Sequence, residues 1–145
     1  MKNKITALFI LLGCALSYSQ QNITWQDLSQ VKYTDKYVEE YDEYFMYPEF
    51  LPPVKVLEGK RITIIGYFLN ISPEEKLYIL SKGPMSACFF CGQGGPETAV
   101  ELQFSNKPNF KTDQIVAITG TLKLNKDDVE HFNYILTGCS GRLVE

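Results

Sequence analysis

The residues with the clearest chemical potential are two cysteines, Cys88 and Cys91, which stand three positions apart. Two thiols at this spacing can form a disulfide, share a metal ion, or exchange disulfides with another protein. A glycine directly after the second thiol is typical of zinc knuckles, since glycine takes positive φ angles readily. The turn that follows the pair contains Gly92, Gly94, Gly95, Pro96 and Glu97.

Three interpretations of the cysteines stay open: a structural disulfide, a thiolate metal site that takes zinc, and thiol exchange. A thioredoxin-type site is disfavoured, because the turn after Cys91 is too rich in glycine and proline to start a helix that lowers a thiol pKa. Cys139 is the candidate third ligand or disulfide partner, because the loop 137–141 is expected to hold it. We expect His131, the only histidine, to be a surface residue.

Nothing in the sequence indicates an enzyme. With one histidine, no Ser-His-Asp arrangement can be assembled, and no pair of carboxylates suggests glycosidic chemistry. The net charge is −3, with lysine and arginine scattered along the chain. Because a nucleic-acid surface needs a basic stripe to neutralise phosphates, we expect no nucleic-acid partner.

The first 19 residues have the pattern of a secretory signal peptide. Lys2 and Lys4 precede an apolar run over 5–16, and small residues follow at 17–19. The run is shorter than the roughly 20 apolar residues of a membrane span, so no span is expected. The sequence therefore predicts export to a periplasmic or extracellular compartment, which is oxidising, so that paired thiols are the default there.

Cys14 offers an alternative to simple secretion, because residues 11–14 resemble a lipoprotein processing site and Cys14 would carry the lipid anchor. Leu12 is bulky for that motif, and Ala15 and Leu16 continue the apolar run. Cleavage near Ser19 or Gln20 is therefore favoured. The mature chain then keeps three cysteines, which cannot all pair within one chain.

Residues 20–53 are predicted to form an N-terminal helical and extended arm. Thr24 can cap a short helix that carries Trp25 and Leu28. Tyrosines over 35–47 recur at helical spacing, which indicates a helical stripe that packs on the body, with an aromatic ligand-binding face as the alternative. The prolines at 48, 52 and 53 indicate an extended linker.

From residue 54 to 145 the pattern is mainly β. Five strands are predicted near 62–68, 77–80, 98–104, 116–124 and 132–137. Two of them carry a glycine in the middle, Gly66 and Gly120, as small barrels need in order to bend and close. We therefore expect a small five-stranded barrel of the oligonucleotide/oligosaccharide-binding (OB) type, with a β-sandwich as the alternative.

The stretch from Cys88 to Glu97 resembles a family of exported bacterial proteins that is catalogued as a domain of unknown function. Its hallmark, a Cys-x-x-Cys turn that runs into Gly-Gly-Pro-Glu, is matched here. The resemblance covers 24–137 and includes the Trp-x-x-Leu element at 25–28, the Leu-x-Gly-Lys element at 57–60 and the Gly-Tyr pair at 66–67. Phe89 stands where relatives often have proline.

The resemblance implies an OB-like barrel in the bacterial envelope, and some relatives are encoded beside envelope permeases and zinc-related genes. It brings no catalytic residues. Together with the sequence patterns it predicts an exported, non-catalytic binding or accessory module with an envelope protein as partner. A thiolate carrier of zinc and a thiol-disulfide redox protein are the alternatives.

Overall fold

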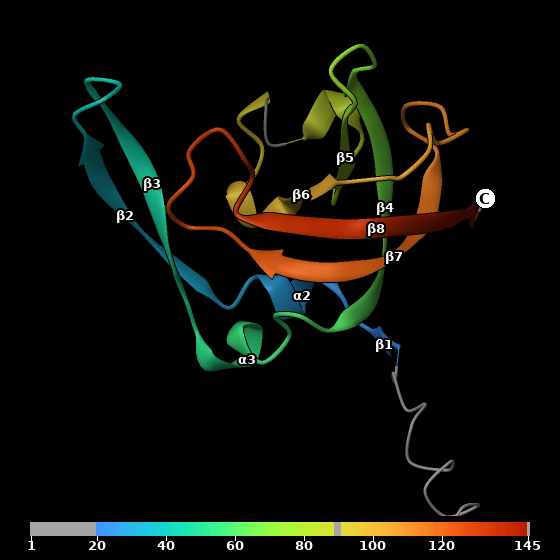
Figure 1. The fold of residues 1–145 in the computed structure, drawn as a ribbon, viewed down its shortest axis with the longest axis horizontal. Coiled ribbons are helices and arrows are strands. Elements are labelled where there is room, and N and C mark those ends of the chain that lie inside the picture. Colours follow the sequence, from blue (N-terminus) through green and yellow to red (C-terminus); the bar gives the residue numbers. More distant parts are fainter. Residues whose placement is uncertain (1–19, 89–90, 145) are drawn as a thin grey trace, which may run out of the picture.

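Five strands close into a barrel in the part of the chain that the structure describes, which confirms the predicted fold class (Figure 1). The computed structural model describes residues 20–88 and 91–144. The predicted signal peptide, Cys14, Phe89 and Phe90 lie outside these residues. The barrel strands are β4 (Arg61–Ser72), β5 (Leu77–Ser81), β6 (Ala99–Leu102), β7 (Ile115–Leu124) and β8 (Tyr134–Leu143).

The order of the strands around the barrel is β4, β5, β6, β8, β7, and β7 pairs back onto β4. β6 and β8 run parallel, and the other pairs are antiparallel. Numbered from β4, the order is 1-2-3-5-4 with closure onto 1, which is the topology of an OB barrel. Closure of one sheet onto itself excludes the β-sandwich alternative.

The two similar segments at 62–66 and 116–120 pair with each other and close the barrel. Ile62 lies opposite Gly120, Ile64 opposite Ile118, and Gly66 opposite Val116. Next to Gly120 the register between β7 and β8 shifts, as expected for a glycine that bends a barrel strand. The inward side chains of both segments belong to one apolar core.

The core fills the barrel, and a second apolar cluster covers the outside of three strands. Inward residues of all five strands, with Tyr134 and Phe68 the largest, form the first cluster. The second cluster consists of Leu69, Ile79, Cys88 and Ala99. Residues 78–81 of β5 are buried on both faces as a result.

The predicted N-terminal helix is confirmed as α2 (Trp25–Leu28). The Asp27 carboxylate accepts hydrogen bonds from the backbone N and the hydroxyl of Thr24 at 2.7 and 2.8 Å. Trp25 donates its indole N–H to the Ile65 carbonyl at 2.8 Å. A Cβ at Gly66 would lie 2.9 Å from the Trp25 ring, so the glycine makes room for this tryptophan. Before α2, β1 (Gln21–Asn22) pairs in parallel with β4.

The helical stripe predicted over 35–47 is wrong. This segment forms a two-stranded antiparallel hairpin of β2 (Val31–Val38) and β3 (Glu43–Phe50), which extends from the barrel as an arm (Figure 1). Tyr37 and Tyr44 lie opposite each other, and 44% and 69% of their surfaces are exposed, so they do not pack on the body. Tyrosine favours strands, and Asp42 at φ 52° makes the turn that brings the strands together.

The prediction of an extended linker at the prolines is also wrong. Pro48 lies within β3, and Pro52 starts α3 (Pro52–Lys55), whose first turn has no need of the missing N–H. Val54 is fully buried in this helix, and the barrel begins at Arg61. Two 3-10 helices, η1 (Met85–Ala87) and η3 (Pro96–Thr98), flank the cysteine pair in sequence.

β8 is longer than predicted and includes Cys139, which the sequence placed in a loop. Gly138 at φ 59° lets the chain bend at this point and continue pairing with β7 as far as Leu143. In residues 20–88 and 91–144 no helix has the length and apolar character needed to cross a membrane.

Replacing the buried tyrosine of β8 tests how α2 is attached to the barrel. The Tyr134 hydroxyl donates to the Leu28 carbonyl at 2.7 Å in the core. Tyr134→Phe should lower the free energy of unfolding by about 1–2 kcal/mol, because a buried carbonyl loses its partner. Denaturant unfolding measures this. The control is Tyr44→Phe on the exposed hairpin, which should leave stability unchanged; equal stability of both variants would contradict the assignment.

Candidate functional site

The structure brings Cys88 and Cys91 together at the surface of the barrel. Both are free thiols. The Cys91 thiol donates to the Met85 carbonyl at 3.2 Å, and the Cys91 backbone N donates to the Cys88 carbonyl at 3.0 Å. Cys88 is buried and Cys91 is exposed. Partial desolvation and the interaction with the Cys88 side chain raise the pKa of Cys91 above its ordinary value, which disfavours the thiolate that disulfide exchange needs.

Cys88 anchors this loop to the outer face of the first three barrel strands. It belongs to the cluster with Leu69, Ile79 and Ala99, and Met85 and Phe132 pack against the same cluster. Known OB barrels bind ligands on the face of their second and third strands and with neighbouring loops. In this chain those strands are β5 and β6, and the cysteine loop covers their outer face.

The glycine-rich turn after the pair is shaped by close contacts. Gly92 and Gly94 have φ angles of 73° and 100°, which glycine adopts without the strain of a side chain. A Cβ at Gly95 would collide with the Glu97 carboxylate, and the Thr98 hydroxyl donates to the Gly95 carbonyl at 2.7 Å. Pro96 then starts η3, which contacts α2. The turn therefore connects the cysteine loop to η3, and through η3 to α2.

The negative charge of Glu97 affects the pKa of two largely buried tyrosines, Tyr33 and Tyr134. Burial is the main cause that raises the pKa of Tyr134, and the negative charge of Glu97 adds to it. The pKa of Tyr33 is raised by burial first, with smaller contributions from Tyr134 and Glu97. Both hydroxyls therefore stay protonated at any physiological pH.

Cys139 does not join the pair. It packs against the barrel core, its thiol donates to the Leu136 carbonyl at 3.1 Å, and burial raises its pKa to about 11. No group of three His, Cys, Asp or Glu side chains in the described ranges could hold a metal ion. The proposal of Cys139 as a third ligand is therefore not supported. Cys88 and Cys91 supply two of the four ligands of a structural zinc site, so these residues do not form one alone.

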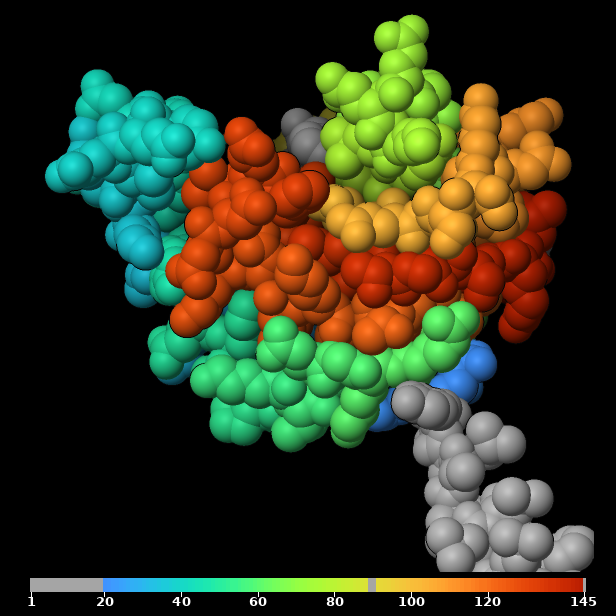
Figure 2. Space-filling view, in the orientation of Figure 1, coloured from blue at the N-terminus to red at the C-terminus, as the bar shows by residue number. Residues whose placement is uncertain are grey.

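A groove lies between the hairpin and the loop that connects β7 to β8. Its volume is about 330 Å³, near the lower end of small-ligand pockets. The hairpin lies beside this loop, and the two occupy the left of the space-filling view (Figure 2). The groove is lined from the hairpin by Lys36, Val38, Tyr44, Phe45, Met46 and Tyr47, from η3 by Pro96, and from the loop by 126–129 and 131–133.

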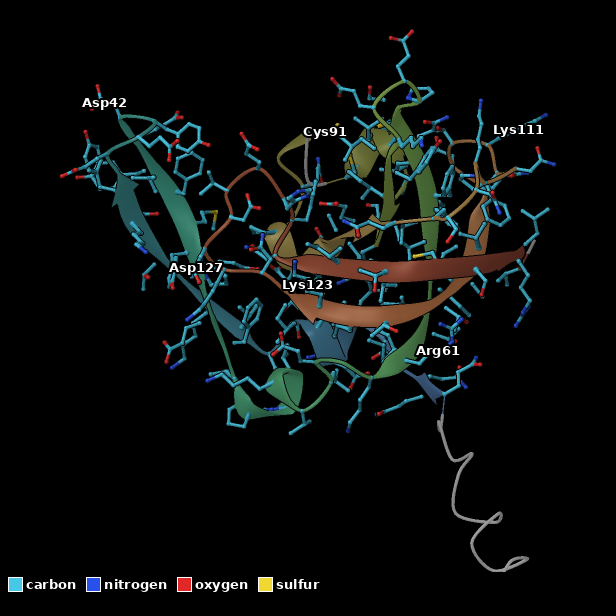
Figure 3. All side chains as sticks on the ribbon, in the orientation of Figure 1. Asp42, Arg61, Cys91, Lys111, Lys123 and Asp127 are labelled. Carbon is cyan, nitrogen blue, oxygen red and sulfur yellow. The ribbon has the colours of Figure 1, made fainter. Side chains whose placement is uncertain are left out.

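Two tyrosines connect the hairpin to the loop. The Tyr47 hydroxyl donates to Asp127 at 3.1 Å, and the Tyr41 hydroxyl donates to Glu130 at 3.4 Å. The Lys36 ammonium lies 4.3 Å from the centre of the Tyr47 ring. Figure 3 shows Asp42 at the tip of the hairpin and Asp127 beside β3. Both walls of the groove are therefore held in position by direct contacts.

The loop wall is held by one buried amide. The Asn125 side-chain NH₂ donates to the carbonyls of Asp128, His131 and Phe132 at 2.7, 3.1 and 3.2 Å. Its side-chain oxygen accepts from the Asp128 backbone N at 3.1 Å. Since one side chain satisfies several loop groups, the groove is formed before any ligand arrives.

Next to the groove lies an ion pair between His131 and Glu101, which was not predicted from the sequence. His131 Nδ1 lies 2.9 Å from Glu101 Oε2, and Gln103 donates to Glu101 Oε1 at 3.0 Å. The Glu101 side chain is 7% exposed and that of His131 is 46% exposed, so His131 is a surface residue as expected, but a paired one. The two residues are thirty positions apart in sequence, and the parallel pairing of β6 with β8 brings them together.

Comparison with known proteins supports the fold alone. No protein-family model and no curated protein matches the sequence. A solved structure of a DUF3299 family protein from Pseudomonas aeruginosa PAO1 is similar with a TM-score of 0.59 and 14% sequence identity. The match covers 88% of this chain and 97% of that one. DUF3299 denotes a domain of unknown function, so the neighbour supports the barrel fold and assigns no activity.

The lone histidine allows a direct test of its ion pair. The hydrogen bond with Glu101, and then its charge, raise the pKa of His131 above the ordinary 6.5. Because the folded-state pKa is the higher one, the stabilisation is complete below pH 6.5 and is lost as the pH rises through the folded value. An NMR titration of the untagged protein should show one imidazole with a pKa above 6.5.

Glu101→Gln should return this pKa toward 6.5, whereas Glu130→Gln, next to His131 in sequence, should change it little. An imidazole pKa at or below 6.5 in the parent protein would contradict the ion pair.

Proposed function

We propose that the protein is an exported, non-catalytic binding module of the bacterial envelope that holds an extended segment of a partner protein in the groove between the hairpin and the β7–β8 loop. The groove itself is the observation that carries this proposal. It is preformed, lined by aromatic and apolar side chains, and rimmed by a few charged groups, as binding sites usually are.

The position of the groove in the fold supports this proposal. OB barrels use the loop between their fourth and fifth strands for binding, and the β7–β8 loop is that connection here. Because the cysteine loop covers the outer face of β5 and β6, the usual binding face is closed and the loop side remains. The two lysines of the lining, Lys36 and Lys126, are offset by Asp127 and Asp128, so the groove lacks the basic stripe that a phosphate backbone needs.

Export is supported by the charged, apolar and small-residue pattern of residues 1–19. A non-catalytic role is supported by the Glu101–His131 pair, because in the described residues the Glu101 carboxylate is occupied by the His131 ring, the Gln103 amide and the Phe132 backbone N. Cys91, the exposed thiol, has a raised pKa, which is the opposite of an activated nucleophile.

A neutral solvatochromic dye, Nile red, tests whether the groove is an accessible binding site. Its fluorescence should rise with the parent protein, and Met46→Glu on the groove wall should reduce the amplitude by about half or more, because a charge replaces apolar lining. Val56→Glu is the control. Val56 is 59% exposed on the surface and does not line the groove, while Met46 is 49% exposed.

Backbone amide shifts recorded with the dye should change at 126–133 and in β3. Equal dye binding by both glutamate variants, or shifts confined to another face, would remove the support for the groove.

The tight turn between the two cysteines, closed by the hydrogen bond from Cys91 N to the Cys88 carbonyl, favours a second role for the Cys88 loop, a disulfide that holds it on the barrel. An oxidising compartment would form this bond. Zinc transport remains an alternative in which a partner or solvent supplies the two missing ligands. Redox exchange is the weaker alternative, since the pKa of Cys91 is raised.

Thiol counting separates these roles. Protein purified from the periplasm and denatured without reductant should show one reactive thiol, Cys139, and reductant should release two more. If a chelator releases these two thiols instead, they hold a metal ion. Three reactive thiols before any treatment would exclude both the disulfide and the metal site. Cys91→Ser should lower the free energy of unfolding of the oxidised protein by about 2 kcal/mol, the value expected for so short a loop. Reduced protein, compared in parallel, should show little effect.

A further inference from the structure

The outer edge of β3 borders the groove. Tyr44, Phe45, Met46 and Tyr47 all line it, although successive side chains of a strand point to opposite faces. Lining by residues of both faces indicates that the groove reaches the edge of the strand, where the two faces meet. The partner residues Lys36 and Val38 on β2 extend the lining onto one face.

This edge has no strand beside it in the described part of the chain. The hairpin is a two-stranded sheet, and β3 pairs with β2 only. In residues 20–88 and 91–144, the backbone groups of 43–48 make no hydrogen bond other than those of the hairpin ladder. Such an edge is a template for an added strand, and recognition by strand addition is a recurrent way of binding extended peptides.

The charges around the edge are strongly one-sided. Residues 35–47 and 126–130 contain eight of the 17 acidic residues of the chain and two of its 14 basic residues. The tip of the hairpin contributes Glu39, Glu40 and Asp42, and the opposite wall contributes Asp127 and Asp128. Within the lining Asp127 and Asp128 are balanced by Lys36 and Lys126, so the net negative charge comes from the surrounding carboxylates, which attract a basic segment and repel an acidic one.

Exposed aromatic rings stand among these acids. Tyr37 and Tyr44 have ring centres 5.2 Å apart, and Tyr41 packs edge-on against Phe45 at 5.6 Å. Lys36, which already lies over the Tyr47 ring, shows that this surface accommodates an ammonium group on an aromatic face. Rings flanked by carboxylates suit lysine and arginine side chains, whose stems pack while their charges are neutralised.

We propose that the groove takes a lysine- or arginine-rich segment of a partner protein, which adds as a third strand to the free edge of β3. Backbone hydrogen bonds to β3 hold the segment, and its cationic side chains meet the aromatic rings and carboxylates on the two walls. This inference rests on the proposed binding function and specifies the chemistry of its ligand.

The test uses a labelled peptide as long as β3, 8 residues, that alternates lysine with valine and threonine. Fluorescence anisotropy with the full mature protein should show saturable binding that weakens as salt is added. Two peptide controls separate the contributions. Replacing every lysine by glutamate should abolish binding, and methylating alternate backbone nitrogens should abolish it while leaving the charge unchanged, because the added strand loses its donors.

Matched charge reversals test the location. Glu39→Lys/Glu40→Lys at the hairpin tip should weaken binding about fivefold or more, as expected for loss of two favourable and gain of two unfavourable surface charges. Glu74→Lys/Glu75→Lys makes the same change in the exposed β4–β5 turn, where the pair also stands side by side. This variant should bind almost as the parent protein does.

Binding of the glutamate or the methylated peptide at parental affinity would overturn the proposal, as would equal effects of the two charge reversals. Sedimentation would also overturn the proposal if the parent protein forms dimers that Glu39→Lys/Glu40→Lys disrupts, because a second copy of the chain would then occupy the free edge of β3. If Nile red still reports the groove while no peptide binds, the binding function stands and this inference fails. If neither binds, both fail.

Discussion

The antiparallel pairing of β4 with β7 is the interaction on which the rest of the structure depends. It closes the sheet, and it buries Ile62, Ile64 and Ile118 in one core. The same pairing fixes where β7 ends, and so where the loop to β8 emerges beside the hairpin. The parallel pairing of β6 with β8 completes the same closed sheet and brings Glu101 to His131. The groove is therefore a consequence of how the barrel closes.

The barrel has two surfaces on which an OB fold can bind a ligand, and this chain uses its own residues to cover one of them. Cys88 packs on the outer side of the first three strands, and the glycine-rich turn ties that loop to the base of the arm. The hairpin then supplies a wall that the barrel lacks. The loop closes one face of the barrel, and the hairpin forms a groove on the side of the β7–β8 loop, lined by aromatic, apolar and charged residues.

Sequence patterns predicted the five barrel strands because burial of one face leaves an alternating signature that is independent of the partner strand. They failed at 35–47, where tyrosines at 37, 41 and 44 fit a helix but lie on exposed strands. A hairpin that stands away from the core leaves no alternation of buried and exposed residues to detect. They also placed Cys139 in a loop, because glycines on both sides suggested a turn where β8 merely bends.

The sequence alone determined the five barrel strands, the barrel class and the cap of α2, since each follows from a local pattern of residues. It also put two thiols within reach of each other, because two intervening residues allow little else. Only the tertiary structure separated Cys139 from that pair, joined Glu101 to His131, and set the hairpin opposite the β7–β8 loop. These relations span tens of residues, and the path of the chain through the closed barrel decides them.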